Sequence, residues 1–260
     1  MMGEGDEGRE GSESRERGSR NEMAPEGMAD LAMAVPAAGG GSRMGGVRKA
    51  GIHLLGEPLL LHALRPLLAH PRVGKIAVAL HPEEAGDPPT WLRELGDARL
   101  MVVAGGDTRG ASVKAALAAL EPLPDFVGVH DGARPLVDRG VLDRCLQVAE
   151  GGRGGVAGWR VVDTLKETDA EGLVIDTPDR SRLWRAQTPQ IFPGSWLRRA
   201  YWEEGASVSR ATDDASLVSA LGLPVEMVEG GAWNLKVTHP DDVAVAEHLL
   251  RRPDGGASVR

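Results

Sequence analysis

The sequence lacks several features that mark secreted, membrane-spanning and metal-binding proteins. Its single cysteine, Cys145, excludes an intramolecular disulfide and is consistent with a reducing compartment. No run of about 18 apolar residues is present that could span a bilayer, and the first thirty residues are acidic and Gly-rich, unlike a secretory signal. The seven histidines are scattered without the spacing of metal ligands. We therefore expect a cytoplasmic protein that associates with no membrane and holds no metal through its own side chains.

A broad basic surface is also missing. The formal net charge is −8, and residues 1–30 contain nine acidic and four basic side chains, which leaves −3 for the remaining 230 residues. A globular part with that charge is not expected to bind nucleic acid. Residues 1–30 also contain almost no large apolar side chains to offset the entropy of ordering them. We expect a disordered acidic tail there, or sequence upstream of a later start codon, and a flexible tail at residues 253–260.

Residues 31–252 alternate short apolar stretches with amphipathic ones. Apolar residues make up 42% of the chain, enough to build the core of a single domain. Buried strands are expected at residues 31–38, 75–80, 100–105 and 125–131, and helices at residues 57–70, 108–123 and 137–150. This alternation predicts an α/β fold with a mostly parallel sheet covered by helices on both faces.

A break in this alternation falls at residues 159–180. Two extended segments turn there at Asp169–Gly172, which predicts a β-hairpin that projects from the domain. A projecting hairpin usually packs against another surface, and a second copy of the chain is the simplest one, so we expect a homodimer. After this arm we expect helices near residues 194–204 and 212–221, late strands in PVEMVEG and AWNLKVT, and a closing helix in PDDVAVAEHLLRR.

The loop after the first expected strand is rich in glycine. Gly39–Gly41 let the backbone wrap closely around phosphate groups, and Arg43 and Lys49 add two cations. The loop is not a Walker A motif, because no Gly-Lys-Ser/Thr follows, and it lacks the third glycine of a dinucleotide-binding loop. Ser42 lacks the flanking glycines of a hydrolase nucleophile. A phosphate-binding loop and a flexible loop with solvated charges both fit this segment.

Polar residues also follow the third and fourth expected strands. Asp107 could accept a hydrogen bond from the amino group of a nucleotide base, and Ser112 could bond to a base or ribose. Alternatively, Asp107 or Thr108 caps the next helix. Asp131 lies beside Arg134 at the end of a buried strand, where a carboxylate is costly unless a ligand or a structural ion pair uses it. Because ligands of parallel sheets bind beyond the carboxyl ends of the strands, we expect these loops to form one site.

The C-terminal part of the chain contains four more polar segments. They are Asp179-Arg180, Gln187–Gln190, Thr212–Ser216 and Asn234–Thr238. The chain has only five lysines against 25 arginines, yet three of the lysines lie in the arm or in polar loops: Lys49, Lys166 and Lys236. This distribution favours sites that use a compact ammonium group instead of a planar guanidinium.

Taken together, these segments resemble the 2-C-methyl-D-erythritol 4-phosphate cytidylyltransferase family. The resemblance runs from about Met33 to Leu250, in family order and with near-family spacing. It is carried by PAAGGGSRM, GGDTRGASV, HDGARP, VVDTLK, DRSRLWRAQTPQ, TDDAS and NLKVT. It implies a Rossmann-like nucleotidyltransferase fold, a homodimer joined through the arm, and Mg²⁺-dependent transfer of a cytidylyl group from CTP to 2-C-methyl-D-erythritol 4-phosphate. Pyrophosphate would be released, as a step of the non-mevalonate isoprenoid pathway.

The resemblance also implies roles for individual residues. Arg43 and Lys49 would hold the triphosphate and stabilise the transition state, and Arg180 and Lys236 would position the acceptor, some of them across the dimer. The residues implied for CTP binding are Ala37, Ala38, Gly39, Gly40, Gly41, Gly106, Asp107, Ser112 and Asp131. Those implied for the acceptor are Arg134, Thr164, Arg180, Thr188, Thr212 and Lys236. The Mg²⁺ ion would be held mainly by the phosphates of the substrates.

The sequence departs from the family at one position and leaves alternatives open. Counting without gaps from Arg43 puts Ala50 where the family has lysine, and a one-residue shift of the loop assigns that role to Lys49. Another polyol phosphate, such as ribitol 5-phosphate, remains an alternative acceptor. The arm and the TDDAS segment argue against a transferase for sugar 1-phosphates or molybdopterin. Arg43 and Lys49 argue against a nucleotide-binding module without catalysis.

Overall fold

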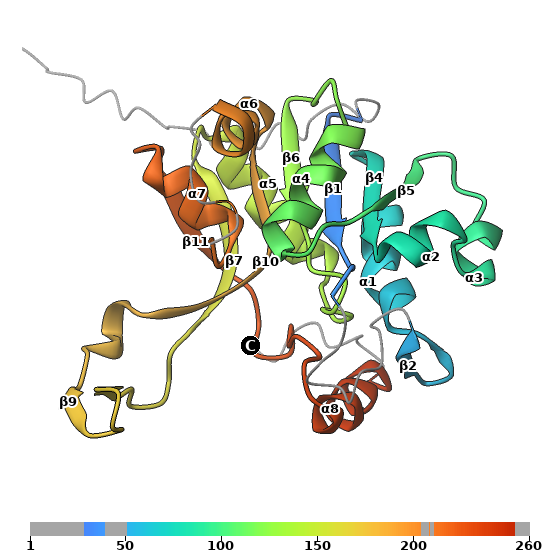
Figure 1. Cartoon of the computed structure of the whole chain (residues 1–260). Coiled ribbons are helices and arrows are strands. Elements are labelled where there is room, and N and C mark those ends of the chain that lie inside the picture. The colour runs from blue at the N-terminus through green and yellow to red at the C-terminus, as the bar shows by residue number, and fades with distance from the viewer. Residues whose placement is uncertain (1–28, 40–50, 204–207, 209–210, 253–260) are drawn as a thin grey trace, which may run out of the picture.

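The central sheet has seven strands in the order β11-β7-β10-β6-β1-β4-β5. The computed structural model (Figure 1) describes residues 29–39, 51–203, 208 and 211–252. Gly40, Gly41, Arg43 and Lys49 lie outside the described residues, as do residues 253–260 and all but the last two residues of the N-terminal segment. In the described part, no helix is long and apolar enough to cross a membrane.

Six of the seven strands run parallel, and only β10 is antiparallel to its neighbours β6 and β7. This arrangement confirms the mostly parallel sheet expected from the sequence. The strands of the sheet are β1 (Leu31–Pro36), β4 (Val73–Leu80), β5 (Leu100–Ala104), β6 (Phe126–Val129), β7 (Gly154–Arg160), β10 (Trp184–Pro193) and β11 (Val225–Glu229). The helices are α1 (Leu59–Leu68), α2 (Pro82–Gly86), α3 (Thr90–Glu94), α4 (Arg109–Ala119), α5 (Arg139–Glu150), α6 (Gly194–Arg198), α7 (Asp214–Ala220) and α8 (Pro240–Leu250). A π-helical turn, η4 (Arg199–Glu203), continues α6.

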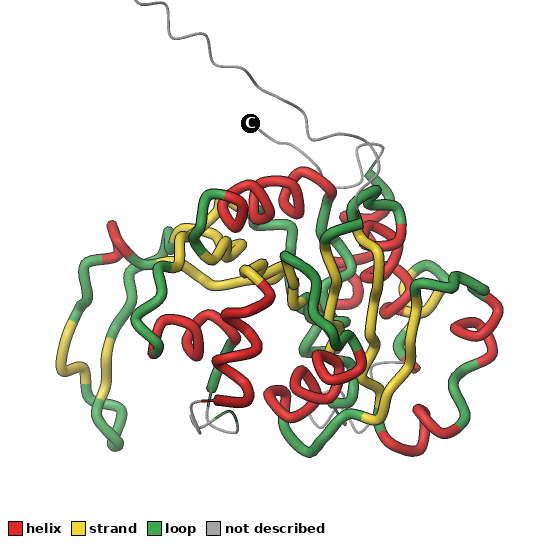
Figure 2. The backbone as a smooth tube through the Cα atoms, turned by 90° about the horizontal axis from the view of Figure 1, so that it is seen from above, coloured by secondary structure: helices red, strands yellow, loops and turns green. Residues whose placement is uncertain are grey.

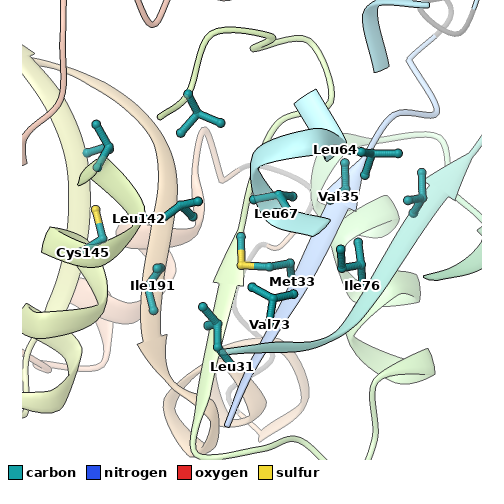
Figure 3. Close-up of a cluster of buried hydrophobic side chains, with 14 of the residues drawn as sticks. Leu31, Met33, Val35, Leu64, Leu67, Val73, Ile76, Leu142, Cys145 and Ile191 are labelled. Atoms are coloured by element: carbon teal, nitrogen blue, oxygen red, sulfur yellow. The ribbon is translucent and has the colours of Figure 1, made fainter. Parts of the chain in front are cut away.

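Strand β1 illustrates why both faces of the sheet are covered. Its side chains alternate between the faces, and Leu31 to Val35 are fully buried. Leu31, Met33 and Val35 face α1 and α5, where Figure 3 shows them among leucines of both helices. Cys145 of α5 lies in this same core, and its burial raises the pKa of the thiol to about 12. Cys145 therefore packs in the core as an apolar side chain.

The opposite face of the sheet carries smaller side chains. Ala32 and Ala34 of β1 lie on the face that packs against α4. The second core on this face contains Val113 and Leu117 of α4, Leu197 of α6 and Leu217 of α7. Figure 2 shows helices on both sides of the strands. A third and smaller core lies under α8, which packs beside the two-stranded ribbon of β2 (His53–Leu54) and β3 (Glu57–Pro58).

The secondary structure differs from the sequence-based predictions in three ways. Residues 154–160 and 184–193, which the sequence did not single out as strands, form β7 and β10 and widen the sheet beyond β6. The expected late strand in residues 232–238 was wrong. Those residues form a turn, with Asn234 N–H donating to Gly231 O, and then an irregular segment. Two short helices, α2 and α3, were also not anticipated.

The arm consists of residues 161–183, between the end of β7 and the start of β10. It carries the short antiparallel pair β8 (Glu167–Thr168) and β9 (Val174–Asp176), closed by a turn in which Gly172 N–H donates to Asp169 O. In Figure 1 the arm extends well away from the sheet. Five large apolar side chains are exposed along it: Val162, Leu165, Leu173, Val174 and Ile175. The projecting hairpin therefore begins after Trp159 and Arg160, which belong to β7.

Candidate active site

Four parallel strands end at the same edge of the sheet and bring their loops together. Strands β1, β4, β5 and β6 are neighbours, and the residues that follow each of them line one cavity of about 550 Å³. Its lining includes Ala38 and Gly39 after β1, His81 after β4, Gly106 to Thr108 after β5, and Asp131 after β6. The expectation that these loops meet is therefore fulfilled for the part of the chain that the structure describes.

A second cavity, of about 240 Å³, adjoins the first. The antiparallel strand β10 contributes its Ala186 to Thr188 segment and Gln190, and the start of α7 contributes Thr212 and Asp213. The two cavities share three lining residues, Arg109, Asp131 and Lys236, which we call the junction residues. A carboxylate flanked by two cations thus lies where the two cavities meet.

Asp131 is the centre of this junction. Its Oδ1 accepts a hydrogen bond from Arg109 Nε at 3.0 Å, and its Oδ2 accepts one from Lys236 Nζ at 2.7 Å. Arg134 Nε lies 3.9 Å from the same Oδ2. Burial alone would favour the protonated acid, but Arg109 and Lys236 lower the pKa of Asp131 far below its ordinary value. The carboxylate is therefore charged throughout the physiological range of pH.

Arg109 connects this carboxylate to a second, fully buried one. Its Nη2 donates to Asp214 Oδ2 at 2.7 Å, and Tyr201 Oη donates to the other oxygen of Asp214 at 2.5 Å. Burial disfavours the charge of Arg109, but Asp214 and Asp131 raise its pKa above the ordinary value. Burial and the neighbouring Asp214 likewise raise the pKa of Tyr201, so its hydroxyl remains a donor.

A buried histidine, His130, and Thr188 form hydrogen bonds that hold the backbone of Asp131 in place. Thr188 Oγ1 accepts the Asp131 N–H at 3.0 Å and lies 3.1 Å from His130 Nδ1. His130 Nε2 lies 3.1 Å from Arg134 O, which can only accept, so Nε2 carries the proton and Nδ1 accepts from the threonine hydroxyl. Burial lowers the pKa of His130 to about 4, so the ring is neutral at pH 7.

Close packing of two loops shapes the larger cavity. A Cβ atom on Gly105 would lie 2.5 Å from Ala38 Cβ and 2.9 Å from Ser112 Oγ, so only glycine fits there. Ser112 Oγ accepts the Gly106 N–H at 3.2 Å and lies 3.0 Å from Thr108 O, and so braces the loop. Thr108 is the N-cap of α4, because its Oγ1 accepts the Ala111 N–H at 3.1 Å. Asp107 is consequently not the cap and lines the cavity.

The residues implied by the resemblance fall into five groups, of which the last, on the arm, is described separately below. Those that line the larger cavity are Ala38, Gly39, Gly106, Asp107, Ser112 and Asp131. Those that line the smaller one are Asp131, Arg134, Thr188, Thr212 and Lys236, and of these Asp131 and Lys236 line both. Ala37 is buried, and its N–H donates to Ala79 O at 2.8 Å. Gly40, Gly41, Arg43 and Lys49 lie outside the described residues.

Two implied residues, Thr164 and Arg180, lie on the arm and line neither cavity of their own chain. Arg180 Nη1 donates to Val162 O at 2.6 Å, within the arm itself. Both residues belong to the segment that projects from the sheet in Figure 1. A single chain therefore does not bring them together with Lys236.

The structure also adds residues that sequence reasoning did not assign to the site. Arg109 and Asp214 lie inside two of the segments that carry the resemblance, GGDTRGASV and TDDAS. The segments could therefore be recognised in the sequence, but no role was predicted for these two residues. Gln190 joins β10 to α7, because its Oε1 accepts the Ala215 N–H at 2.9 Å and its Nε2 donates to Asp213 Oδ2 at 3.0 Å. Tyr201 gave no signal, because only the tertiary fold brings it to Asp214.

Among the described residues, no three His, Cys, Asp or Glu side chains come close enough to hold a metal ion together. The carboxylate at the junction is already bonded to Arg109 and Lys236. This donor set fits a divalent cation whose ligands are chiefly phosphate oxygens and water, which is the usual situation for Mg²⁺ at phosphate-transfer sites.

An open, mostly parallel sheet with two adjoining cavities at its carboxyl edge, joined by cations, defines an α/β nucleotidyltransferase. The family model for 2-C-methyl-D-erythritol 4-phosphate cytidylyltransferase matches residues 31–252, and the chain belongs to this family. Relatives carrying that name include one from Aeromonas hydrophila, 42% identical over 85% of this chain and 90% of its own. Another, from Xanthomonas campestris, is 44% identical over 86% of both chains.

Solved structures agree with this assignment. The 2-C-methyl-D-erythritol 4-phosphate cytidylyltransferase of Thermus thermophilus superposes with a TM-score of 0.71 at 35% identity, covering 86% of this chain and all of its own. The 4-diphosphocytidyl-2C-methyl-D-erythritol synthase of Anaerococcus prevotii superposes with a TM-score of 0.75 at 26% identity, covering 85% and 96%. The chain is thus an enzyme of the nucleotidyltransferase class, and its function follows from this family.

Proposed function

We propose that this chain transfers the cytidylyl group of CTP to 2-C-methyl-D-erythritol 4-phosphate and releases pyrophosphate. The observation that carries the proposal is the pair of adjoining cavities that share Arg109, Asp131 and Lys236. Two substrates that must react with one another need two pockets with a common wall, and two anionic substrates need cations there. Relatives that are more than 40% identical carry the name of this activity.

CTP is assigned to the larger cavity. The glycine-rich segment after β1 supplies Ala38 and Gly39, and the loop after β5 supplies Asp107, whose carboxylate can accept a hydrogen bond from the amino group of cytosine. Ser112 acts mainly by bracing this loop, since its hydroxyl is bonded to backbone groups. Arg43 and Lys49 are assigned to the triphosphate on the family resemblance alone.

The acceptor is assigned to the smaller cavity. Its lining of Arg134, Thr188, Thr212 and Lys236 offers two cations for a phosphate group and hydroxyl groups for a polyol. Arg134 Nη1 is held by Asn234 O at 2.7 Å, whereas its Nε is buried without a hydrogen-bond partner among the described residues. An acceptor oxygen would satisfy that donor.

The chemistry requires no general base. An oxygen of the acceptor phosphate attacks the α-phosphorus of CTP, and the second pKa of such a phosphate is about 6, so the nucleophile is already an anion at pH 7. The protein must bring two anions together and offset the charge that develops at the α-phosphate and the leaving group. His130, which is buried and engaged by Thr188 and Arg134, is accordingly not needed as a base.

Magnesium is proposed as the metal. The phosphates of CTP would supply most of its ligands, and Asp107 and Asp131 are the carboxylates that line the larger cavity. When bound, the ion would neutralise charge on the triphosphate. The residues of this chain would orient the substrates around it.

A homodimer joined through the arm completes the proposal. The exposed apolar side chains of residues 162–175 supply a contact surface, and Thr164 and Arg180 would reach the acceptor pocket of the partner subunit. We further propose a single catalytic domain at residues 31–252, tails at residues 1–30 and 253–260, and a cytoplasmic location. Asp30, the last residue of the N-terminal tail, joins it to the domain, because its carboxylate pairs with Arg72 at 2.6 Å.

The test is pyrophosphate release with CTP and Mg²⁺, using methylerythritol 4-phosphate or ribitol 5-phosphate as acceptor. We expect turnover with the former and at least about a hundredfold lower kcat/KM with the latter, since unpaired buried polar groups disfavour the wrong polyol. Preferential turnover of ribitol 5-phosphate would overturn the acceptor while leaving the nucleotide site intact. Tight CTP binding without turnover of either acceptor would indicate a binding module.

A further inference from the structure

Arg109 links the junction of the two cavities to a buried anchor. Its Nε donates to Asp131 Oδ1 at 3.0 Å and its Nη2 donates to Asp214 Oδ2 at 2.7 Å. Asp214 is fully buried and its second oxygen accepts from Tyr201 Oη at 2.5 Å. The remaining oxygen of Asp131 holds Lys236 Nζ at 2.7 Å. Five side chains from five separate parts of the fold therefore form one continuous hydrogen-bonded chain.

We propose that Arg109 is a positioning residue of the transfer reaction, which fixes the carboxylate of Asp131 so that Oδ2 holds Lys236 at the junction of the two cavities. The kinetic consequence of this inference rests on the proposed function. The geometric consequence, the placement of Lys236, does not.

The planarity of the guanidinium group supports this role. Arg109 binds two separate carboxylates through one rigid plane, and one of them, Asp214, cannot move because it is buried and bonded to Tyr201. With Oδ1 bound to this plane, the carboxylate of Asp131 cannot rotate freely, and Oδ2 keeps a fixed direction. The long, flexible side chain of Lys236 then has one defined ion-pair partner before substrate arrives.

Arg72 provides a matched control for a purely structural role. It also bridges two carboxylates, with Nη2 at 2.6 Å from Asp30 Oδ2 and Nη1 at 2.5 Å from Glu150 Oε1. Its side chain has the same 23% exposure as that of Arg109. Arg72 lines neither cavity of the site. Any effect that comes only from losing an arginine bridge between two carboxylates should appear in both Arg72→Lys and Arg109→Lys.

The first experiment measures the reactivity of Lys236 without substrate. Ligand-free wild type, Arg109→Lys and Arg72→Lys are treated with trace acetic anhydride, and acylation of Lys236 is measured by peptide mass spectrometry relative to exposed Lys75. An amine held against Asp131 by a hydrogen bond is less accessible to the reagent than one that moves freely in the cavity. We expect Arg109→Lys to raise relative acylation of Lys236 by about threefold or more, and Arg72→Lys to leave it unchanged. An unchanged rate in folded Arg109→Lys would overturn the inference.

Tyr201→Phe is the replacement variant for the acylation assay if Arg109→Lys does not fold. It removes only the hydroxyl group that restrains Asp214 and leaves every charge in place. We expect a smaller rise in the acylation of Lys236, in the same direction. The inference is overturned if folded Tyr201→Phe matches the wild type in this assay, since the anchor would then not control the placement of Lys236.

The second experiment measures steady-state kinetics and CTP affinity. We expect Arg109→Lys to lower kcat at least about tenfold and to raise KM for the acceptor, with less than about a threefold change in the CTP dissociation constant. Arg72→Lys should retain both kinetic parameters. Equal, small losses in the two variants would show a structural role only and would overturn the inference. If the wild type itself does not turn over the acceptor, the proposed function fails, whereas the acylation result still decides the role of Arg109.

Discussion

Lys236 Nζ lies 2.7 Å from Asp131 Oδ2, although the two residues are 105 positions apart in the chain. The contact forms because the irregular segment after β11 returns to the loop after β6, where Val237 N–H donates to Ala133 O at 2.8 Å. Val237 is fully buried and fixes this segment in place. The ammonium group of Lys236 is thereby delivered to the wall shared by both cavities.

Lys236→Met should abolish acceptor positioning while keeping the aliphatic part of the side chain. We expect kcat/KM for the acceptor to fall by on the order of a hundredfold or more, since a cation is lost where two anions must meet. The CTP dissociation constant should change little. Steady-state kinetics and calorimetry measure the two effects, with Lys75→Met on the exposed surface as control. Equal loss of CTP binding would contradict the assignment of Lys236 to the acceptor.

The proposed contribution of Arg180 across the dimer can be tested by complementation. Arg180→Ala and Lys236→Ala should each be nearly inactive alone. In an equimolar mixture that has exchanged subunits, half of the dimers are mixed and each mixed dimer has one intact site, so about one quarter of wild-type activity should return. Pyrophosphate release measures this recovery. No recovery despite proven exchange of subunits would show that Arg180 serves its own chain or no site at all.

The apolar arm should control the oligomeric state. Val174 is 59% exposed on β9, and Val174→Asp would place a charge on the proposed dimer contact. We expect this variant to be monomeric by sedimentation velocity and to lose most of its turnover. Val245→Asp on α8 is a matched control, because Val245 is similarly exposed, at 51%, outside the arm. Dimers of undiminished stability in Val174→Asp would exclude the arm as the main interface.

His130 should make stability depend on pH in a defined window. Its pKa is lowered from 6.5 to about 4, so between these values the unfolded chain binds a proton that the folded chain does not. The free energy of unfolding should therefore fall as pH falls from 6.5 to 4, by roughly 3 kcal/mol from this group. Urea unfolding of wild type and His130→Gln across this range measures the difference. Parallel pH profiles for the two proteins would contradict the prediction.

Gly105→Ala should weaken CTP binding without unfolding the protein. The new Cβ would lie 2.5 Å from Ala38 Cβ, so the two loops that line the larger cavity must move apart. We expect about a fivefold or greater rise in the CTP dissociation constant, because overpacking of this kind costs about 1 kcal/mol or more. Gly86→Ala is the control, since nothing lies within 4 Å of its added Cβ. Unchanged affinity in Gly105→Ala would mean that this contact does not shape the nucleotide site.

Local patterns in the sequence were sufficient to predict the strands that lie wholly within the core. The six residues of β1 and the eight of β4 are nearly continuous apolar runs, because both of their faces are buried under helices. Glycine-rich and polar residues directly after β1, β5 and β6 then marked the edge of the sheet where the cavities lie. These signals depend on neighbouring residues only.

Strands β7 and β10 were harder to foresee. Strand β7 begins with two glycines, and Gly155 lies so close to α5 that a Cβ would come within 2.3 Å of Cys145 O. Strand β10 mixes exposed and buried polar residues, because it passes from the base of the arm into the wall of the smaller cavity. The expected strand at residues 232–238 failed for a related reason: its apolar residues pack under α8 and not in the sheet.

Local patterns along the chain were enough to predict the α/β alternation, the projecting hairpin and, through seven ordered segments, the family to which the chain belongs. Which charges meet depends instead on the three-dimensional fold. Arg109, Asp131, Asp214 and Lys236 are up to 127 positions apart, and a buried ion pair forms only where folding removes water from both partners at one place. No local pattern encodes that meeting, because it depends on the strand order of the whole sheet.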